Sequence, residues 1–145
     1  MGKELKHLSQ QDKGETPIRG VTLIGDLFQG ASNSKTNRDL ASAIKAEFEF
    51  EPTLVNPKFA TGLDADLLLS PAKHHDVIVT LEDGILDGGF GQKIASFYGA
   101  SKMKVLNYGL RKEFVDGYNV NDLLEKYGLA PRNIIGDMVR LGFLR

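Results

Sequence analysis

Residues 76–91, which read DVIVTLEDGILDGGFG, decide the fold of this chain. An apolar run at 77–81, rich in β-branched residues, ends at two adjacent carboxylates, Glu82 and Asp83. A glycine-rich turn follows at 88–91, and a helical pattern begins directly after it. A strand, an acidic corner and a glycine turn that leads into a helix are typical of the functional edge of an open α/β sheet.

The rest of the chain alternates between short β-rich runs and helical patterns. Further strands are predicted at 21–24, 53–55 and 103–108. Helices are predicted at 37–48, 63–73, 92–98, 121–127 and from Pro131 onward. Such alternation predicts an α/β fold in three layers, α/β/α, with a mainly parallel sheet covered by helices on both faces.

Apolar residues are spaced along the predicted helices. In the first helix Leu40, Ala41, Ile44 and Phe48 fall on one face, and the last helix carries the apolar residues Ile134, Ile135, Met138, Val139 and Leu141. In the helix at 92–98 they are Ile94, Ala95 and Phe97. Thr36 or Asn37 is the predicted N-cap of the first helix, and Asp64 lies near the start of the second, where a carboxylate complements the helix dipole.

Two segments are expected along the chain. Residues 1–15 are polar and lack a sustained apolar face, so we expect an arm, with a short helical turn near Leu5 and Leu8. Residues 16–145 form the domain, and 16–19 has the character of an edge strand because proline is tolerated there.

Composition excludes several classes of protein. The formal net charge is −1, which gives no electrostatic basis for binding nucleic acid or an anionic membrane. The chain has no cysteine, so disulfides, thiol catalysis and thiolate metal sites are excluded. No apolar run approaches the ~20 residues that span a bilayer. With no apolar core of a signal peptide at residue 1, we expect a cytoplasmic protein.

The acidic corner admits two chemical interpretations besides a structural one. The glycines at 88–91 resemble an amide nest for a phosphate, but Glu82, Asp83 and Asp87 would repel that anion. Glu82 and Asp83 are also a candidate acid/base pair, although neighbours on a strand point to opposite faces. We favour the structural interpretation, in which the glycines permit close helix–sheet approach and a carboxylate caps the following helix.

Other motifs give weaker evidence of a function. The spacing of glycines at 25–30 is that of a phosphate-binding loop, and Ser32 fits its hydroxyl position, but Ala31 stands where the lysine is required. His74 and His75 are adjacent, so they point apart on a helix and do not make a metal site. We therefore predict no catalytic and no metal-binding residue in this chain.

Three blocks of sequence together are similar to a known family. They are VTLEDG at 79–84, GGFG at 88–91 and VLNYGL at 105–110, with Phe114 beyond them. In this order they resemble the C-terminal domain of the transketolase family, and most closely that of the 1-deoxy-D-xylulose-5-phosphate synthases. VNPKF at 55–59 and the segment from Tyr127 to Ile134 are also similar, whereas Asp83, Arg111, Lys112, Gly117 and Tyr118 depart from the family pattern.

The resemblance implies a structural role in a larger enzyme. Such an enzyme transfers a two-carbon unit with thiamine diphosphate and Mg²⁺, which are held by upstream domains of the same or a companion chain. This segment would bind neither, would be inactive alone, and would complete a homodimer. The residues it implies for structure or interface are Glu82, Asp83, Gly88, Gly89, Gly91, Asn107 and Gly109. The alternative is a stand-alone module that binds a small ligand near Gly25, Glu82 and Gly88.

Overall fold

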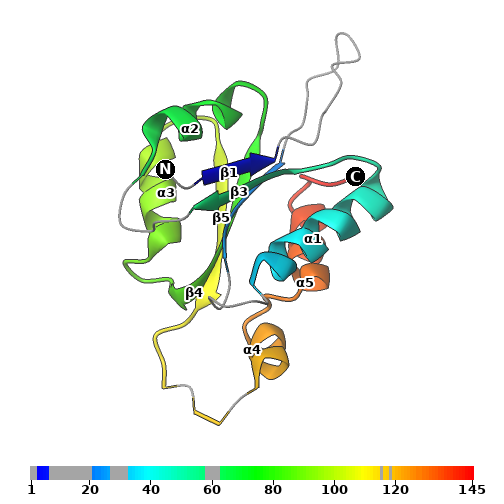
Figure 1. The fold of residues 1–145 in the computed structure, drawn as a ribbon, viewed down its shortest axis with the longest axis vertical. Helices are drawn as coiled ribbons and strands as arrows, with labels where there is room; N and C mark the ends of the chain where they lie inside the picture. Colours follow the sequence, from blue (N-terminus) through cyan, green and yellow to red (C-terminus); the bar gives the residue numbers. More distant parts are fainter. Residues whose placement is uncertain (1–2, 7–20, 27–32, 58–62, 115, 118) are drawn as a thin grey trace.

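The computed structural model describes residues 3–6, 21–26, 33–57, 63–114, 116–117 and 119–145. The described strands form one sheet in the order β1-β3-β2-β4-β5 (Figure 1). They are β1 (Lys3–Lys6), β2 (Val21–Asp26), β3 (Thr53–Pro57), β4 (Val77–Ile85) and β5 (Lys104–Leu110). Strands β3, β2, β4 and β5 run parallel and β1 pairs antiparallel with β3, which confirms the mainly parallel sheet.

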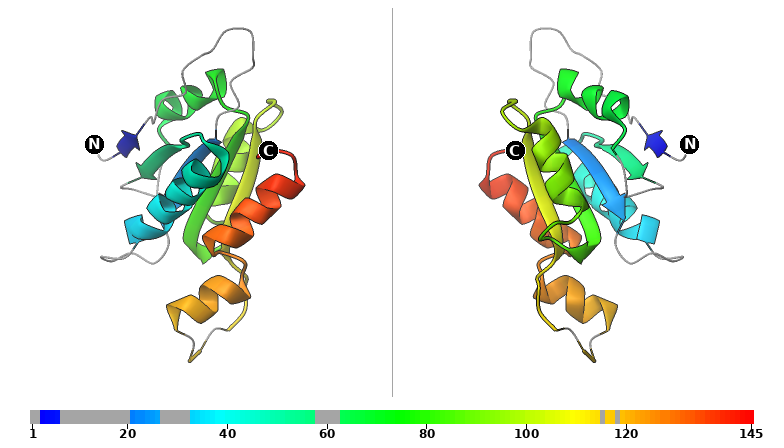
Figure 2. Two further views of the ribbon diagram at one scale, coloured as in Figure 1. Left: turned by 90° about the vertical axis from the view of Figure 1, so that its right-hand side faces the viewer. Right: turned by 90° about the vertical axis from the view of Figure 1, so that its left-hand side faces the viewer.

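Helices lie on both faces of this sheet. They are α1 (Asn33–Phe48), α2 (Ala65–Leu69), α3 (Phe90–Tyr98), α4 (Val120–Lys126) and α5 (Pro131–Arg140), with a 3₁₀ helix, η1, at Pro71–Lys73. Helices α1 and α5 cover one face and α2 and α3 cover the other, while α4 lies beyond the end of the sheet (Figures 1 and 2). The predicted three-layer α/β/α fold is therefore confirmed.

Strand β4 lies inside the sheet and is buried on both faces, which explains its apolar sequence. Val77, Val79 and Leu81 pack with α1 and α5, in one cluster with Leu40, Ala41, Ile44, Ile134, Ile135 and Met138. Ile78 packs on the opposite face with Val55, Leu68, Ile94 and Tyr98. Because side chains alternate along a strand, Thr80 and Glu82 share the face of Ile78.

Two tyrosines join elements of the fold through hydrogen bonds. The Tyr98 hydroxyl donates to the carbonyl oxygen of Leu68 at 2.5 Å and links α3 to α2. Burial raises the pKa of Tyr98 to about 12. The Tyr108 hydroxyl donates to Asp137 Oδ2 at 2.9 Å and links β5 to α5, and burial, followed by this hydrogen bond, raises the pKa of Tyr108.

Several predicted boundaries were wrong. Leu5 lies in strand β1, not in a helical turn, because backbone pairing with the edge of β3 fixes this short polar segment. Helix α1 begins at Asn33, which places Thr36 and Asn37 inside the helix and not at its N-cap. Pro71 divides the helix predicted at 63–73 into α2 and η1, since proline lacks the N–H that continues a helix.

Some of the other predictions are confirmed, and others are not tested. Asp64 does cap α2, and its Oδ1 accepts from the Leu67 N–H at 3.1 Å. Leu8 and the edge strand at 16–19 lie outside the described residues. None of the helices described here is long and apolar enough to cross a membrane.

Val139 and Leu141, two apolar residues of the predicted last helix, are only partly buried. Their side chains are 46% and 49% exposed, whereas Ile134, Ile135 and Met138 of the same segment are buried. Leu141 follows the last residue of α5, so the helical period no longer places it. Val139 lies within α5, and its burial is incomplete.

Candidate functional site

Glu82 is the centre of the candidate site. Its side chain is 8% exposed and lies where β4 meets the start of α3. The carboxylate accepts hydrogen bonds from the Phe90 N–H at 3.2 Å and the Gly91 N–H at 2.5 Å. The first amides of a helix have no partner within the helix and carry the positive end of its dipole. Glu82 thus caps α3 from the neighbouring strand, as the structural interpretation of this corner predicted.

Glycines surround the carboxylate because there is no room for larger residues. A Cβ at Gly89 would overlap Glu82 Oε1 and would lie 2.6 Å from the carbonyl oxygen of Ile85. A Cβ at Gly109, on β5, would lie 3.0 Å from Glu82 Cγ. Of the predicted residues, Glu82, Gly89 and Gly109 therefore form one packed corner.

Gly91 lets α3 approach the sheet closely beside this corner. Its Cβ would lie 2.7 Å from both Asn107 Oδ1 and Thr80 Oγ1. These two side chains are joined across β4 and β5, where the Thr80 hydroxyl donates to Asn107 Oδ1 at 2.6 Å. Asn107 was predicted, but Thr80 was missed, although its position two residues before Glu82 already placed it on the same face.

The last two predicted residues have different places. Gly88 adopts φ +73°, a conformation that glycine accepts without strain, and its N–H donates to Gln92 Oε1 at 2.8 Å. Asp83 belongs to β4, but its side chain is outside the described residues. The acid/base pair of Glu82 and Asp83 stays an untested hypothesis.

The geometry argues against a phosphate or a metal at this corner. A phosphate at the start of α3 would compete with Glu82 for the same N–H groups and be repelled by its carboxylate. His74 is exposed and His75 lies half-buried, its Nε2 3.4 Å from Thr53 Oγ1. Within the described ranges there is no group of three His, Asp or Glu residues that could hold a metal ion.

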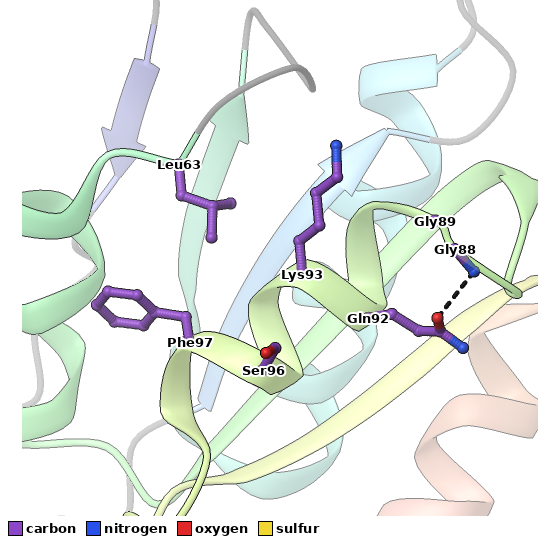
Figure 3. Close-up of a pocket in the computed structure, with 7 residues that line it drawn as sticks. All are labelled: Leu63, Gly88, Gly89, Gln92, Lys93, Ser96 and Phe97. Atoms are coloured by element: carbon purple, nitrogen blue, oxygen red, sulfur yellow. Dashed lines mark hydrogen bonds between the residues drawn. The ribbon is translucent and has the colours of Figure 1, made fainter.

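A hollow of about 470 Å³ opens on the outer side of α3 (Figure 3). It is lined by Leu63, Gly88, Gly89, Gln92, Lys93, Ser96 and Phe97. Leu63 and Phe97 form its apolar end, and Gln92 lies at the glycine turn (Figure 3). Lys93 and Ser96 are the exposed polar groups between them. This group of residues was not identified from the sequence, because α3 was considered there only for the side that faces the core.

A second polar cluster lies near α4. Glu113 accepts a hydrogen bond from the Tyr127 hydroxyl and forms an ion pair with Lys126 Nζ at 3.2 Å. The hydrogen bond from Tyr127 is the first cause, and the bond from Lys126 the second, that lowers the pKa of Glu113. The same bond raises the pKa of Tyr127. This cluster is exposed and fixes the segment after β5 against α4.

The structure is an α/β domain with a mainly parallel sheet, in which Glu82 of β4 accepts hydrogen bonds from the first amides of α3. The chain belongs to the family of transketolase C-terminal domains, because the model of that family ("Transketolase, C-terminal domain") matches residues 34–134. The resemblance seen in the sequence is thereby confirmed.

Curated relatives are named 1-deoxy-D-xylulose-5-phosphate synthase. That of Corynebacterium diphtheriae is 32% identical over 136 residues, which make up 92% of this chain and 20% of the relative. That of Clostridium tetani is 32% identical over 133 residues, 90% of this chain and 20% of the relative. The chain therefore spans about a fifth of the length of these relatives, which carry further domains.

Solved structures share the fold. A split-gene transketolase, described as an inactive β4 tetramer, superposes with a TM-score of 0.68 at 24% identity, over 97% of this chain and 48% of that one. A 2-oxoglutarate:ferredoxin oxidoreductase from Magnetococcus marinus gives 0.54 at 14% identity, over 97% and 19% of the two chains. These similarities concern the fold alone.

Proposed function

We propose that this chain is the C-terminal structural and dimerisation domain of a thiamine-diphosphate-dependent enzyme of the 1-deoxy-D-xylulose-5-phosphate synthase type. The parent enzyme transfers a two-carbon unit, and its thiamine diphosphate and Mg²⁺ bind to upstream domains of the same or a companion polypeptide. The chain alone is inactive, and the assembled enzyme is a cytoplasmic homodimer. The matched family and the short share of each relative that the chain spans support this proposal.

The observation that carries the proposal is the use of Glu82 within the fold. Its carboxylate is buried and bonded to the first amides of α3, so the best-marked acidic residue is engaged in joining a strand to a helix. A diphosphate would need free amides or cations at this edge, and a bridging metal would need several oxygen ligands. The described residues do not fit that cofactor, which favours a structural role for the corner.

Thermal unfolding of the isolated chain tests the absence of cofactor binding. A ligand that binds only the native state at 100 times its Kd stabilises it by ~2.7 kcal/mol, which is readily seen as a rise in Tm. We expect no rise with thiamine diphosphate and Mg²⁺. A rise that depends on their concentration would contradict the proposal.

Reconstitution tests whether the chain assembles with the rest of the enzyme and is needed for its activity. The partner is the thiamine-diphosphate-binding polypeptide of the same organism, called here the companion polypeptide. We expect it to form a stable complex with this chain and to gain synthase activity only in that complex. A companion polypeptide that is fully active and dimeric without this chain would refute the structural role.

The alternative function is binding of a small ligand, and the hollow beside α3 favours it. Lys93 is the charged side chain that lines the hollow, so the ligand would be a small anion with an apolar part resting on Leu63 and Phe97. Titration with small phosphates and carboxylates, followed by NMR of the Lys93 and Ser96 amides, would reveal such a site, and a Lys93→Glu variant is its control.

A further inference from the structure

The two edges of the sheet differ in sequence. Among the described strands, β1 lies at one edge and β5 at the other (Figure 2). An uncovered edge presents a row of unpaired N–H and C=O groups, and proteins protect such edges with short strands and charged residues. Strand β1 fits this pattern, because it is four residues long and reads KELK. Strand β5 does not, because it is seven residues long, reads KVLNYGL and carries one charge, on Lys104. The β5 edge is therefore suited to pairing with a further strand.

Hydrogen bonds at both ends of β5 show which of its backbone groups point away from β4. The Lys104 N–H donates to the carbonyl oxygen of Asp76 at 3.0 Å, and the Leu110 carbonyl oxygen accepts from the loop after β4 at 2.9 Å. In a strand the N–H and C=O of one residue point to the same side, and this side alternates from residue to residue. Val105 and Asn107 therefore direct their N–H and C=O groups away from β4. None of these four groups forms a hydrogen bond within the described part of the chain.

Strand β5 of a second copy offers the matching groups. When two copies pair antiparallel about a two-fold axis through Leu106, Val105 of each copy lies opposite Asn107 of the other. The two residues of such a pair exchange both of their hydrogen bonds, so the two pairs form four. Gly109, the next residue that points away from β4, is buried and stays outside this pairing. All outward groups of Val105 and Asn107 are thus satisfied by the same groups of the other copy.

The side chains of β5 are compatible with this arrangement. Leu106 lies opposite its own counterpart in a non-hydrogen-bonded pair, the kind in which side chains approach most closely. Leu106 and Tyr108 are half-buried and pack against the cluster of buried residues that includes α5, so a second copy would cover apolar surface that the described chain leaves open. Lys104 lies opposite Tyr108 of the other copy, so the one charge of the strand does not meet its own counterpart.

The side of the domain at this edge is large enough for a dimer. Seven residues at ~3.3 Å each make β5 roughly 23 Å long. The sheet and its two helical layers are together about 30 Å thick, since packed layers lie ~10 Å apart. This side therefore measures roughly 700 Å², against about 800 Å² that each partner buries in a stable complex. Pairing of the two β5 edges, with α3 and α5 beside them, approaches the size that a stable dimer needs.

We propose that β5 is the dimerisation edge of this domain and pairs antiparallel with β5 of a second copy about a two-fold axis through Leu106. This inference rests on the proposed function, to which it adds the surface and the register of the dimer. The same residues of both copies take part, so the contact closes with two copies and leaves the charged β1 edges outside.

Self-association of the chain tests the pairing through two substitutions at one position. Val105→Pro removes an outward N–H, whereas the hydrogen bonds to β4 use the neighbouring residues and are kept. Val105→Thr has nearly the same shape and keeps the N–H, so it is the matched control. In sedimentation equilibrium we expect the original chain to be a dimer, Val105→Pro to raise the Kd of the dimer at least tenfold, and Val105→Thr to change it little. Urea unfolding curves show whether each variant is folded.

Cross-linking tests the register and does not depend on the proline variant. The chain has no cysteine, so Leu106→Cys introduces a single thiol. Across the two-fold axis the two Cα atoms would be ~4.5 Å apart, which a disulfide can bridge. We expect mild oxidation with diamide to link Leu106→Cys into covalent dimers. Ser96→Cys, exposed on α3, should stay unlinked at the same concentration.

The same cross-linking in the complex with the companion polypeptide separates this inference from the function on which it rests. If the chain forms neither a dimer nor this complex, the proposed function fails and the pairing fails with it. If an active, dimeric complex forms but Leu106→Cys is not linked, the pairing is wrong while the function stands. If the original chain is monomeric and Val105→Pro no longer binds the companion polypeptide, the edge takes a strand of that polypeptide and the inference is overturned.

Discussion

Replacing Glu82 with glutamine should destabilise the chain by removing a charge that caps α3 from β4. Glutamine has nearly the same shape, so the corner stays filled. It keeps one acceptor oxygen, but its NH₂ group must face either the Phe90 or the Gly91 N–H, where the carboxylate oxygens now accept at 3.2 and 2.5 Å. One of the two hydrogen bonds is therefore lost.

The size of the effect follows from these contacts. A hydrogen bond to a charged group contributes ~1.5–3 kcal/mol, and a charge at a helix start contributes ~0.3–2 kcal/mol through the dipole. Removal of a buried charge relieves its desolvation, which offsets part of this loss. We expect Glu82→Gln to lower the free energy of unfolding by about 2 kcal/mol, or Tm by roughly 6 °C in a chain of this length.

Urea and thermal unfolding of Glu82→Gln and of a matched control measure this loss. Asp87→Asn removes a carboxylate from the same turn, but Asp87 is exposed, so the control should change Tm by no more than ~1 °C. Hydrogen exchange of the Phe90 and Gly91 amides should accelerate in Glu82→Gln and not in the control. The reasoning is refuted if Glu82→Gln melts with the original chain, or if Asp87→Asn loses as much stability.

Further predictions concern other contacts of the fold. Gly91→Ala should lose ~1–3 kcal/mol in urea unfolding because its methyl group overlaps neighbours at 2.7 Å, whereas Gly136→Ala should gain ~0.5–1 kcal/mol, and equal signs would contradict the packing argument. Tyr98 has a folded pKa of about 12 against an ordinary 10, so unfolding by urea should become easier as pH rises from 10 to 12, and less so in Tyr98→Phe. Tyr127→Phe should raise the pKa of Glu113 in an NMR titration, because the hydrogen bond from Tyr127 is what chiefly lowers it. The lowered pKa stabilises the folded chain at pH values above the ordinary pKa of a glutamate, and this stabilisation, which is lost in acid, should be smaller in the variant. An unchanged titration would show that the hydrogen bond does not persist in solution.

The architecture of the sheet could be predicted in part from the sequence. Alternating apolar runs and helical patterns gave the parallel sheet and its two helical layers, since each run was long enough to show its period. Strand β1 was missed because KELK has no apolar alternation and forms by pairing with the edge of β3. That pairing depends on where the edge lies in space, which a local pattern does not contain.

The cap of α3 was foreseen as a kind of contact but not as a particular residue. Three carboxylates, at 82, 83 and 87, were close enough in sequence to serve. The period of β4 placed residue 82 on the side of Ile78, yet the helix that covers this side is chosen by the crossover after the strand. The reason for each glycine depends on side chains of β4 and β5 that lie far away in the sequence, as the reason for Gly91 depends on Asn107.

Val139 shows why an apolar period can mislead about one chain and still be informative. It is one of the apolar residues of the predicted last helix and lies four residues after the buried Ile135, yet its side chain is 46% exposed. A sequence pattern records burial in the assembled protein, whether the cover comes from the same domain or from another one. Gly136 lies on the same helix and is equally unexplained, because a helix gains nothing from glycine at an open position. An exposed apolar residue and a glycine with no packing reason thus lie on one side of α5, where neither apolar spacing nor helix propensity accounts for the sequence.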